Sequence, residues 1–239
     1  MPKEKFFTDT DFDKQLSIGD SLVFDKADLR ILRIELSWYG TDLDVCAFML
    51  DKDKELPSKD SLVFYNSNLR WKTTHPFDSE EFNPLKGTVS EWDENGPYKN
   101  RHKWLLNTLP LSPDGSVIGS WDDASEEDDD NQECQEVMHV LLDEIDQRRY
   151  DSIILAAAVA KKQILKGERF QDAKTPIVKI YNADNDELLA EYRLDQEFPG
   201  KDVVCFGEVK LTPNRMFWTF NPLAESYNGG IERLAREVF

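Results

Sequence analysis

The stretch "DLRILRIELSWYGTDLDVCAFML", residues 28–50, decides the fold class. In its first part apolar residues alternate with polar ones, at Leu32, Ile34, Leu36 and Trp38. This period of two is typical of a strand with one buried face. The second part, "DLDVCAFML" (42–50), is apolar on both faces after its first residues, which predicts a strand buried on both sides. The stretch therefore predicts two consecutive strands, the second of them in the core.

Similar short apolar runs recur along the chain, separated by polar or Gly/Pro-containing turns. They predict further strands at 61–66, 136–141, 152–160, 176–181, 188–194, 203–209 and 216–220. Eight or nine short strands at this spacing indicate an all-β fold, a two-sheet β-sandwich. The ending "NGGIERLAREVF" (228–239) places apolar residues at helical spacing, at Ile231, Leu234, Ala235 and Val238. We therefore expect a short C-terminal helix on the sheets, and a second short helix within 142–150.

Residues 69–109 differ in character from the rest of the chain. They show little periodicity, several turn signals and three of the six tryptophans, at Trp71, Trp92 and Trp104. Disordered segments are poor in aromatic residues, so we expect this one to fold. The organisation predicted is one domain over residues 1–239, with 69–109 as an aromatic-rich insertion packed on the sandwich.

The charge of the chain is strongly negative and unevenly distributed. The formal net charge is −18, and Trp104 to Gln147 contain thirteen acidic residues but no Lys or Arg. Such a surface repels nucleic acid and anionic membranes, and it favours cations or basic partners. We therefore expect no nucleic-acid partner.

Cysteine usage and hydropathy indicate a cytoplasmic protein. The three cysteines form no CxxC motif, and the N-terminal residues lack the apolar core of a signal peptide. The longest mostly apolar stretch, "SIILAAAVA" (152–160), is about half as long as a membrane-spanning helix. We expect no direct membrane insertion.

The concentration of carboxylates is the main chemical signal. Asp42 and Asp44 share one face of a predicted strand, about 7 Å apart, where their mutual repulsion and desolvation favour a bound cation. Eight of the twelve positions from Asp122 to Glu133 are also acidic. Calcium takes six to eight oxygen ligands, and a long acidic loop can supply several of them. The pattern of an EF-hand is absent from this loop.

Other chemistries have little support in the sequence. The motifs G-x-S-x-G, P-loop and G-x-G-x-x-G are absent, and the three histidines lack zinc-site spacing. We therefore predict that the protein is not an enzyme. Two alternatives stay open: a hydrolase that uses the paired carboxylates, and a carbohydrate-binding sandwich with structural calcium.

The chain resembles the TerD-type tellurium-resistance and general stress proteins. Seven segments carry the resemblance in order: "LSWYGTDLDVCAFML", "DSLVFYNSN", "SPDGSV" with the acidic loop after it, "YDSIILAAAVA", "KIYNADNDELLAEYRL", "VCFGEV" and "SYNGGIERLAREVF". Members of this family are β-sandwiches that bind calcium through the Asp-x-Asp strand end and the acidic loop. Resemblance therefore implies a non-enzymatic module for resistance to tellurite or another chemical stress. It also implies protein partners, including a membrane-associated stress-response complex.

The resemblance also implies particular ligands and two adjacent calcium ions. The matching positions are Asp42, Asp44, Asn66, Asp122, Asp123, Glu127, Asp129 and Glu133. Asn66 enters only through the family. Binding would order the acidic loop and change the surface offered to a partner.

Three features depart from the family pattern. The loop contains none of the usual glycines, and the His-Asp pair that often follows the "LAAAVA" strand is replaced by Lys161 and Lys162. Short family members also lack the insertion at 69–109. The insertion is therefore the part of the chain in which we expect a function particular to this protein.

Overall fold

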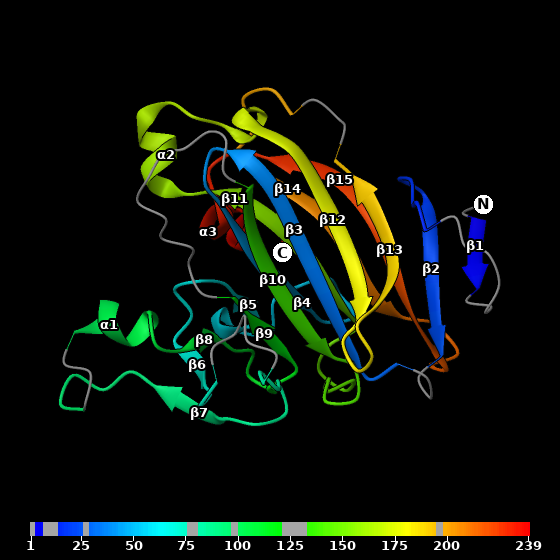
Figure 1. Cartoon of the computed structure of the whole chain (residues 1–239), viewed down its shortest axis with the longest axis horizontal. Helices are drawn as coiled ribbons and strands as arrows, with labels where there is room; N and C mark the ends of the chain where they lie inside the picture. The colour runs from blue at the N-terminus through cyan, green and yellow to red at the C-terminus, as the bar shows by residue number, and fades with distance from the viewer. Residues whose placement is uncertain are drawn as a thin grey trace.

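Two β-sheets packed face to face form the body of the protein (Figure 1). The computed structural model describes residues 3–6, 14–25, 29–75, 81–96, 100–120, 133–194 and 198–239. The larger sheet has the strand order β1 (Lys3–Phe6), β2 (Asp20–Asp25), β15 (Phe217–Tyr227), β14 (Val203–Leu211), β11 (Ser152–Val159), β4 (Leu43–Leu50), β5 (Leu62–Val63). The smaller has the order β13 (Glu187–Arg193), β12 (Ala173–Asn182), β3 (Ile31–Gly40), β10 (Glu133–Leu141), β9 (Val117–Gly119). This confirms the predicted two-sheet sandwich.

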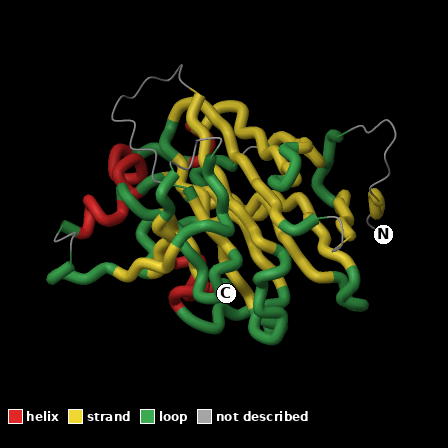
Figure 2. The backbone as a smooth tube through the Cα atoms, turned by 60° about the horizontal axis from the view of Figure 1, so that its bottom comes forward, coloured by secondary structure: helices red, strands yellow, loops and turns green. Residues whose placement is uncertain are grey.

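The remaining elements lie around the sandwich. A three-stranded sheet has the order β7 (Thr88–Glu91), β6 (Leu69–Lys72), β8 (Leu109–Pro110). The described residues also contain the helices α1 (Arg101–Leu105), α2 (Lys161–Lys166) and α3 (Ile231–Glu237) and the 3₁₀ turns η1 (Lys59–Ser61) and η2 (Phe170–Asp172). Figure 2 shows the strands in the middle of the molecule and the helices on the side away from the N-terminus.

The opening stretch crosses from one sheet to the other. β3 pairs with β10 and β12, whereas β4 pairs with β11 and β5. The indole N–H of Trp38 donates to the carbonyl of Thr41 at 2.8 Å, which fixes the connection. Gly40 has φ +91°, and a Cβ there would lie 2.6 Å from the Asp172 carbonyl oxygen, so only glycine fits.

The two faces of β4 are buried by different partners. Leu43, Val45, Ala47 and Met49 join the main core between the sheets. Cys46, Phe48 and Leu50 lie on the outer face in a second cluster with Ile231 and Leu234 of α3. A strand covered by a sheet on one side and a helix on the other has no polar face, which explains the continuous apolar run.

The C-terminal helix forms as predicted, with one difference. α3 ends at Glu237, so Val238 lies beyond the helix and is 45% exposed, not packed as its spacing indicated. Phe239 packs instead, with its ring centroid 4.9 Å from that of Phe48.

Two other sequence predictions were wrong in detail. The strand predicted at 61–66 is only the two residues of β5, because the chain turns at once through Phe64 to Ser67. The helix predicted within 142–150 is absent, and this segment forms turns in which the backbone N–H groups of Arg149 and Tyr150 donate to the Asp146 carbonyl. The sequence reasoning also missed α2, β2 and the three-stranded sheet.

Arg70 holds the segment 69–109 together. Its side chain is 1% exposed and donates to the carbonyls of Tyr65, Leu105 and Thr108 and to the Thr108 hydroxyl. Charge-assisted hydrogen bonds of this kind are strong, and here they join β6 to the chain around α1.

The same segment covers part of the outer face of the smaller sheet. Phe82 packs on the buried His139 of β10 with ring centroids 5.4 Å apart, beside an apolar cluster that includes Leu109 and Ile118. These contacts accord with an insertion that packs on the sandwich. The division into one domain with an insertion stays a prediction from the sequence.

Acid is expected to weaken the fold through His139. Burial, with a smaller effect of the Arg33 charge, lowers the pKa of His139 to about 3. The unfolded chain therefore binds a proton more readily than the folded chain, and stability is lost as pH falls from about 6.5 toward 3. Between pH 7 and 5 the wild type should lose roughly 2 kcal/mol more than His139→Gln, measured by urea unfolding. The matching change at an exposed histidine, His102→Gln, should keep the wild-type pH dependence, and equal slopes for all three would contradict the prediction.

Gly207 is expected to tolerate no side chain. It follows a bulge in β14, and a Cβ there would lie 2.5 Å from Cζ of the buried Phe220. Gly207→Ala should destabilise the protein by about 1–3 kcal/mol through overpacking. Phe220→Leu in the same chain should recover part of that loss, as measured by thermal unfolding. A Gly207→Ala variant as stable as the wild type would contradict this description of the core.

Candidate metal centre

The acidic loop connects β9 to β10 and ends beside the last residues of β3. β9 pairs with β10 up to Gly119 opposite Met138, and the Val137 N–H donates to the Ser120 hydroxyl. β10 begins at Glu133, which pairs with Tyr39 at the end of β3. The end of the loop thus lies near the connection that leads into β4, whereas its start lies beside Val137, further along β10. Four predicted ligands within the loop lie outside the described residues: Asp122, Asp123, Glu127 and Asp129.

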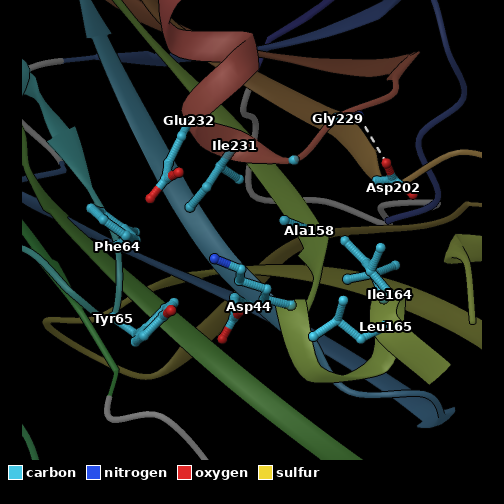
Figure 3. A pocket seen from close by; sticks show the side chains of 13 residues that line it. Asp44, Phe64, Tyr65, Ala158, Ile164, Leu165, Asp202, Gly229, Ile231 and Glu232 are labelled. Atoms are coloured by element: carbon cyan, nitrogen blue, oxygen red, sulfur yellow. Dashed lines mark hydrogen bonds between the residues drawn. The ribbon is translucent and has the colours of Figure 1, made fainter. Parts of the chain in front are cut away.

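Asp44 lies at the buried start of β4. It is 7% exposed and faces outward from the sheet, on the same side as Cys46. Its side chain borders a pocket of about 400 Å³ together with Phe64 and Tyr65. Figure 3 shows Asp44 at the centre of this pocket, with the two aromatic side chains on one side and Ile164 and Leu165 of α2 on the other.

Asp42 lies just before β4 and is more exposed. Its side chain is 21% exposed, and Oδ2 lies 3.2 Å from Nζ of Lys162 on α2. Its backbone carbonyl accepts a hydrogen bond from the N–H of Ala160 at 3.0 Å. Lys162, which stands where the His-Asp pair was expected from the resemblance, therefore forms an ion pair with the predicted calcium ligand Asp42.

Glu136 is the functional candidate that the sequence reasoning missed. It is 5% exposed, and Oε2 accepts a hydrogen bond from the N–H of Val45 at 2.5 Å. Glu136 belongs to the smaller sheet and Val45 to the larger one, so this carboxylate joins the two sheets. The signal that could have found it is a charged residue at an inward position of an alternating strand, followed by Met138 and Val140.

The surroundings of Cys46 raise the pKa of its thiol. Burial raises its pKa well above the usual value, and the neighbouring Cys205 and the negative charges of Asp44 and Glu136 raise it further. Burial also raises the pKa of Cys205 to about 12. Both thiols therefore stay protonated and unreactive at neutral pH, as expected of core cysteines.

Two predicted ligands point elsewhere. Glu133 is exposed on the outer face of the smaller sheet, in a hollow with Glu35 and Lys179. Because strand side chains alternate, Glu133 and Glu136 face opposite sides of β10. Asn66 lies in the turn after β5, where its side-chain oxygen accepts from Arg101 Nη2 at 3.1 Å. Asp42 and Asp44 thus lie at the start of β4, and Glu136 contacts the backbone of the residue that follows Asp44. Glu133 lies on the outer face of the smaller sheet, and Asn66 is bound by Arg101.

The pocket at Asp44 is acidic as well as apolar. Asp202 and Glu232 line it with Asp44, against one lysine, Lys161. Asp202 is engaged in the structure, since Oδ2 accepts from the Gly229 N–H at 2.8 Å and Oδ1 lies 3.3 Å from Arg169 Nε. Its contact with Gly229 holds the start of α3 in place.

The donor set suits a hard cation such as calcium. The carboxylates of Asp42, Asp44 and Glu136 supply oxygen, which Ca²⁺ and Mg²⁺ prefer over nitrogen or sulfur. Within the ranges that the structure describes, no three His, Cys, Asp or Glu side chains already form a metal-binding group. A calcium ion here would need further oxygens, which the acidic loop carries in its sequence.

Comparisons with known proteins place the chain in a family. The TerD domain profile matches residues 91–238, more than half of the 239 residues. The crystal structure of SAV2460, a protein of unknown function, has a TM-score of 0.50 and 18% identity, covering 87% of this chain and 95% of that chain. The crystal structure of SCO6318 from Streptomyces coelicolor A3(2), a homologue of the telluride resistance protein TerD, has a TM-score of 0.45 and 14% identity, covering 87% and 96%. The comparison with curated proteins gave no match.

These findings confirm the resemblance seen in the sequence. The profile match begins after the β3–β4 connection, so Asp42, Asp44 and Asn66 lie before it, whereas Glu136 and the acidic loop lie within it. The likeness to SAV2460 supports the same overall fold. On the strength of the match over residues 91–238, the chain belongs to the TerD family.

Proposed function

We propose that the chain is a calcium-binding, non-enzymatic stress-response module in which Ca²⁺ orders the acidic loop for interaction with a protein partner. The observation that carries the proposal is that two buried carboxylates serve neighbouring residues at the start of β4: Asp44 itself, and Glu136, which accepts from the N–H of the next residue, Val45. The acidic loop leads into β10, the strand that carries Glu136.

Burial is the reason for a cation at this position. Asp44 and Glu136 are 7% and 5% exposed, and both charges act on the same thiol, that of Cys46. Two carboxylates removed from water near each other raise the free energy of the folded state unless a cation or several donors compensate. Calcium fits better than magnesium, because it accepts irregular sets of six to eight oxygens.

The loop would complete the coordination sphere. The resemblance implies two adjacent ions, with Asp122, Asp123, Glu127 and Asp129 among the ligands. A loop with eight acidic residues in twelve positions repels itself in the absence of metal. Calcium would remove that repulsion and hold the loop against the edge of β10, which changes the surface that a partner meets.

The biological setting follows from the family. We propose resistance to tellurite or another chemical stress, in the cytoplasm, through a protein partner that belongs to a membrane-associated complex. Nothing in the described part of the chain forms a helix long and apolar enough to cross a bilayer. The net charge of −18 continues to argue against nucleic acid as a partner.

The carbohydrate-binding alternative loses its main support. It depended on exposed tryptophans in the segment 69–109. Trp104 is 1% exposed and donates to the Ser90 hydroxyl at 3.0 Å, and Trp92 lies under the Arg101 guanidinium at 5.7 Å. These rings are therefore occupied by contacts within the protein. The hydrolase alternative stays a prediction that glycoside-cleavage assays can test.

Calcium titration tests the proposal at Asp44. Isothermal calorimetry of metal-free protein in a magnesium background should show calcium binding, and Asp44→Asn should weaken it roughly tenfold or more if the carboxylate is a ligand. Asp53→Asn is the matched control, because the Asp53 side chain is exposed and its carboxylate pairs with the neighbouring Lys52. The control should bind like the wild type. Absence of heat and of thermal stabilisation by calcium would overturn the proposal.

Two variants of Glu136 distinguish an effect on folding from an effect on calcium binding. Glu136→Gln keeps an oxygen that can accept the Val45 N–H, so the fold should stay close to wild-type stability while calcium binding weakens. Glu136→Ala leaves that buried N–H without its acceptor, and should cost about 1–3 kcal/mol of unfolding free energy as well. Urea unfolding and calorimetry on both variants check this. Unchanged calcium affinity in Glu136→Gln would exclude Glu136 from the site.

A further inference from the structure

We infer that Arg101 occupies the oxygens of Asn66 and so excludes Asn66 from the calcium site. The chain then binds one calcium ion, at the start of β4. The inference rests on the proposed calcium binding and corrects its ligand set and ion number. It concerns the insertion, the segment that short family members lack.

Arg101 is bound to Asn66 through several contacts. Its Nη2 lies 3.2 Å from the Asn66 backbone carbonyl oxygen, 3.1 Å from the Asn66 side-chain oxygen and 3.3 Å from the side-chain oxygen of Asn68. Both Asn66 oxygens that could ligate a metal therefore already face a positive charge.

The insertion fixes the position of Arg101. It is the first residue of α1, where the Asn100 side chain accepts from the His102 N–H at 2.9 Å. Its guanidinium lies 5.7 Å from the ring centroids of both Trp92 and Trp104. Cation–π contacts with two rings and a helix cap hold the arginine in one place.

A calcium ion cannot use Asn66 while Arg101 stays. Calcium needs its oxygen ligands at about 2.3–2.6 Å, on the same oxygen that the guanidinium already contacts. Two cations would then share one neutral oxygen, and their mutual repulsion would weaken both contacts. Calcium would have to expel Arg101 and break its contacts with Asn66, Asn68 and both tryptophans.

Lys162 is a weaker obstacle than Arg101. Its ion pair with Asp42 spans 3.2 Å, and its side chain is 58% exposed. Exposed pairs of this kind contribute little, and the long lysine chain can swing into water. Asp42 also carries a full negative charge, which favours Ca²⁺ over a single ammonium group. We therefore keep Asp42 in the calcium site and exclude only Asn66.

The test is the number of calcium ions bound, measured by calorimetry and by equilibrium dialysis with ⁴⁵Ca²⁺. The wild type should bind one ion, and Asn66→Ala should bind it with unchanged affinity. Arg101→Gln should bind two, and the second should vanish again in Arg101→Gln/Asn66→Ala. Lys103→Gln is the matched control, because it removes one positive charge from an exposed position of the same helix. It should bind one ion.

Each other result has a defined meaning. Two ions in the wild type, with one lost in Asn66→Ala, would overturn the inference and leave the calcium proposal standing. One ion in Arg101→Gln would overturn the role of Arg101 as the block. Calcium binding by Arg101→Gln but not by the wild type would overturn the one-ion inference together with the proposed function. No binding by either protein would overturn both.

Discussion

The hydrogen bond from the Val45 N–H to the Glu136 carboxylate ties the two sheets of the sandwich together at the start of β4. It runs from the larger sheet to the smaller one, through a side chain that is 5% exposed. A buried carboxylate stabilises a fold only when donors or cations offset its desolvation. The same group therefore joins the two sheets and adds a buried negative charge at the start of β4.

The strand β4 places groups from both of its faces near this charge. Its inner face completes the core between the sheets, while its outer face is covered by α3 and opens at Asp44 into the acidic pocket. One strand thus presents a carboxylate outward and a backbone N–H to a carboxylate from the opposite sheet. Because the acidic loop leads into β10, the strand that carries Glu136, metal binding and loop order are expected to be coupled.

The sequence predicted the architecture well because burial patterns are local. The alternation in β3 and the continuous apolar run of β4 each follow from the surfaces that cover them. Which residues face the site depends instead on how the strands pair, that is, on their register. Glu133 and Glu136 lie in the same strand, but only the pairing of β10 with β3 shows which of them faces inward. Asn66 could not be assessed from sequence either, because its partner Arg101 lies 35 positions away in a segment without periodicity.

A crystal structure of the protein grown with calcium can show whether one ion binds at the start of β4. We expect anomalous density for one ion within about 2.3–2.6 Å of an Asp44 carboxylate oxygen, with Glu136 or loop carboxylates among its other ligands. Arg101 should still contact Asn66 in that structure. An ion bound elsewhere, or Asp44 without metal at saturating calcium, would contradict the account.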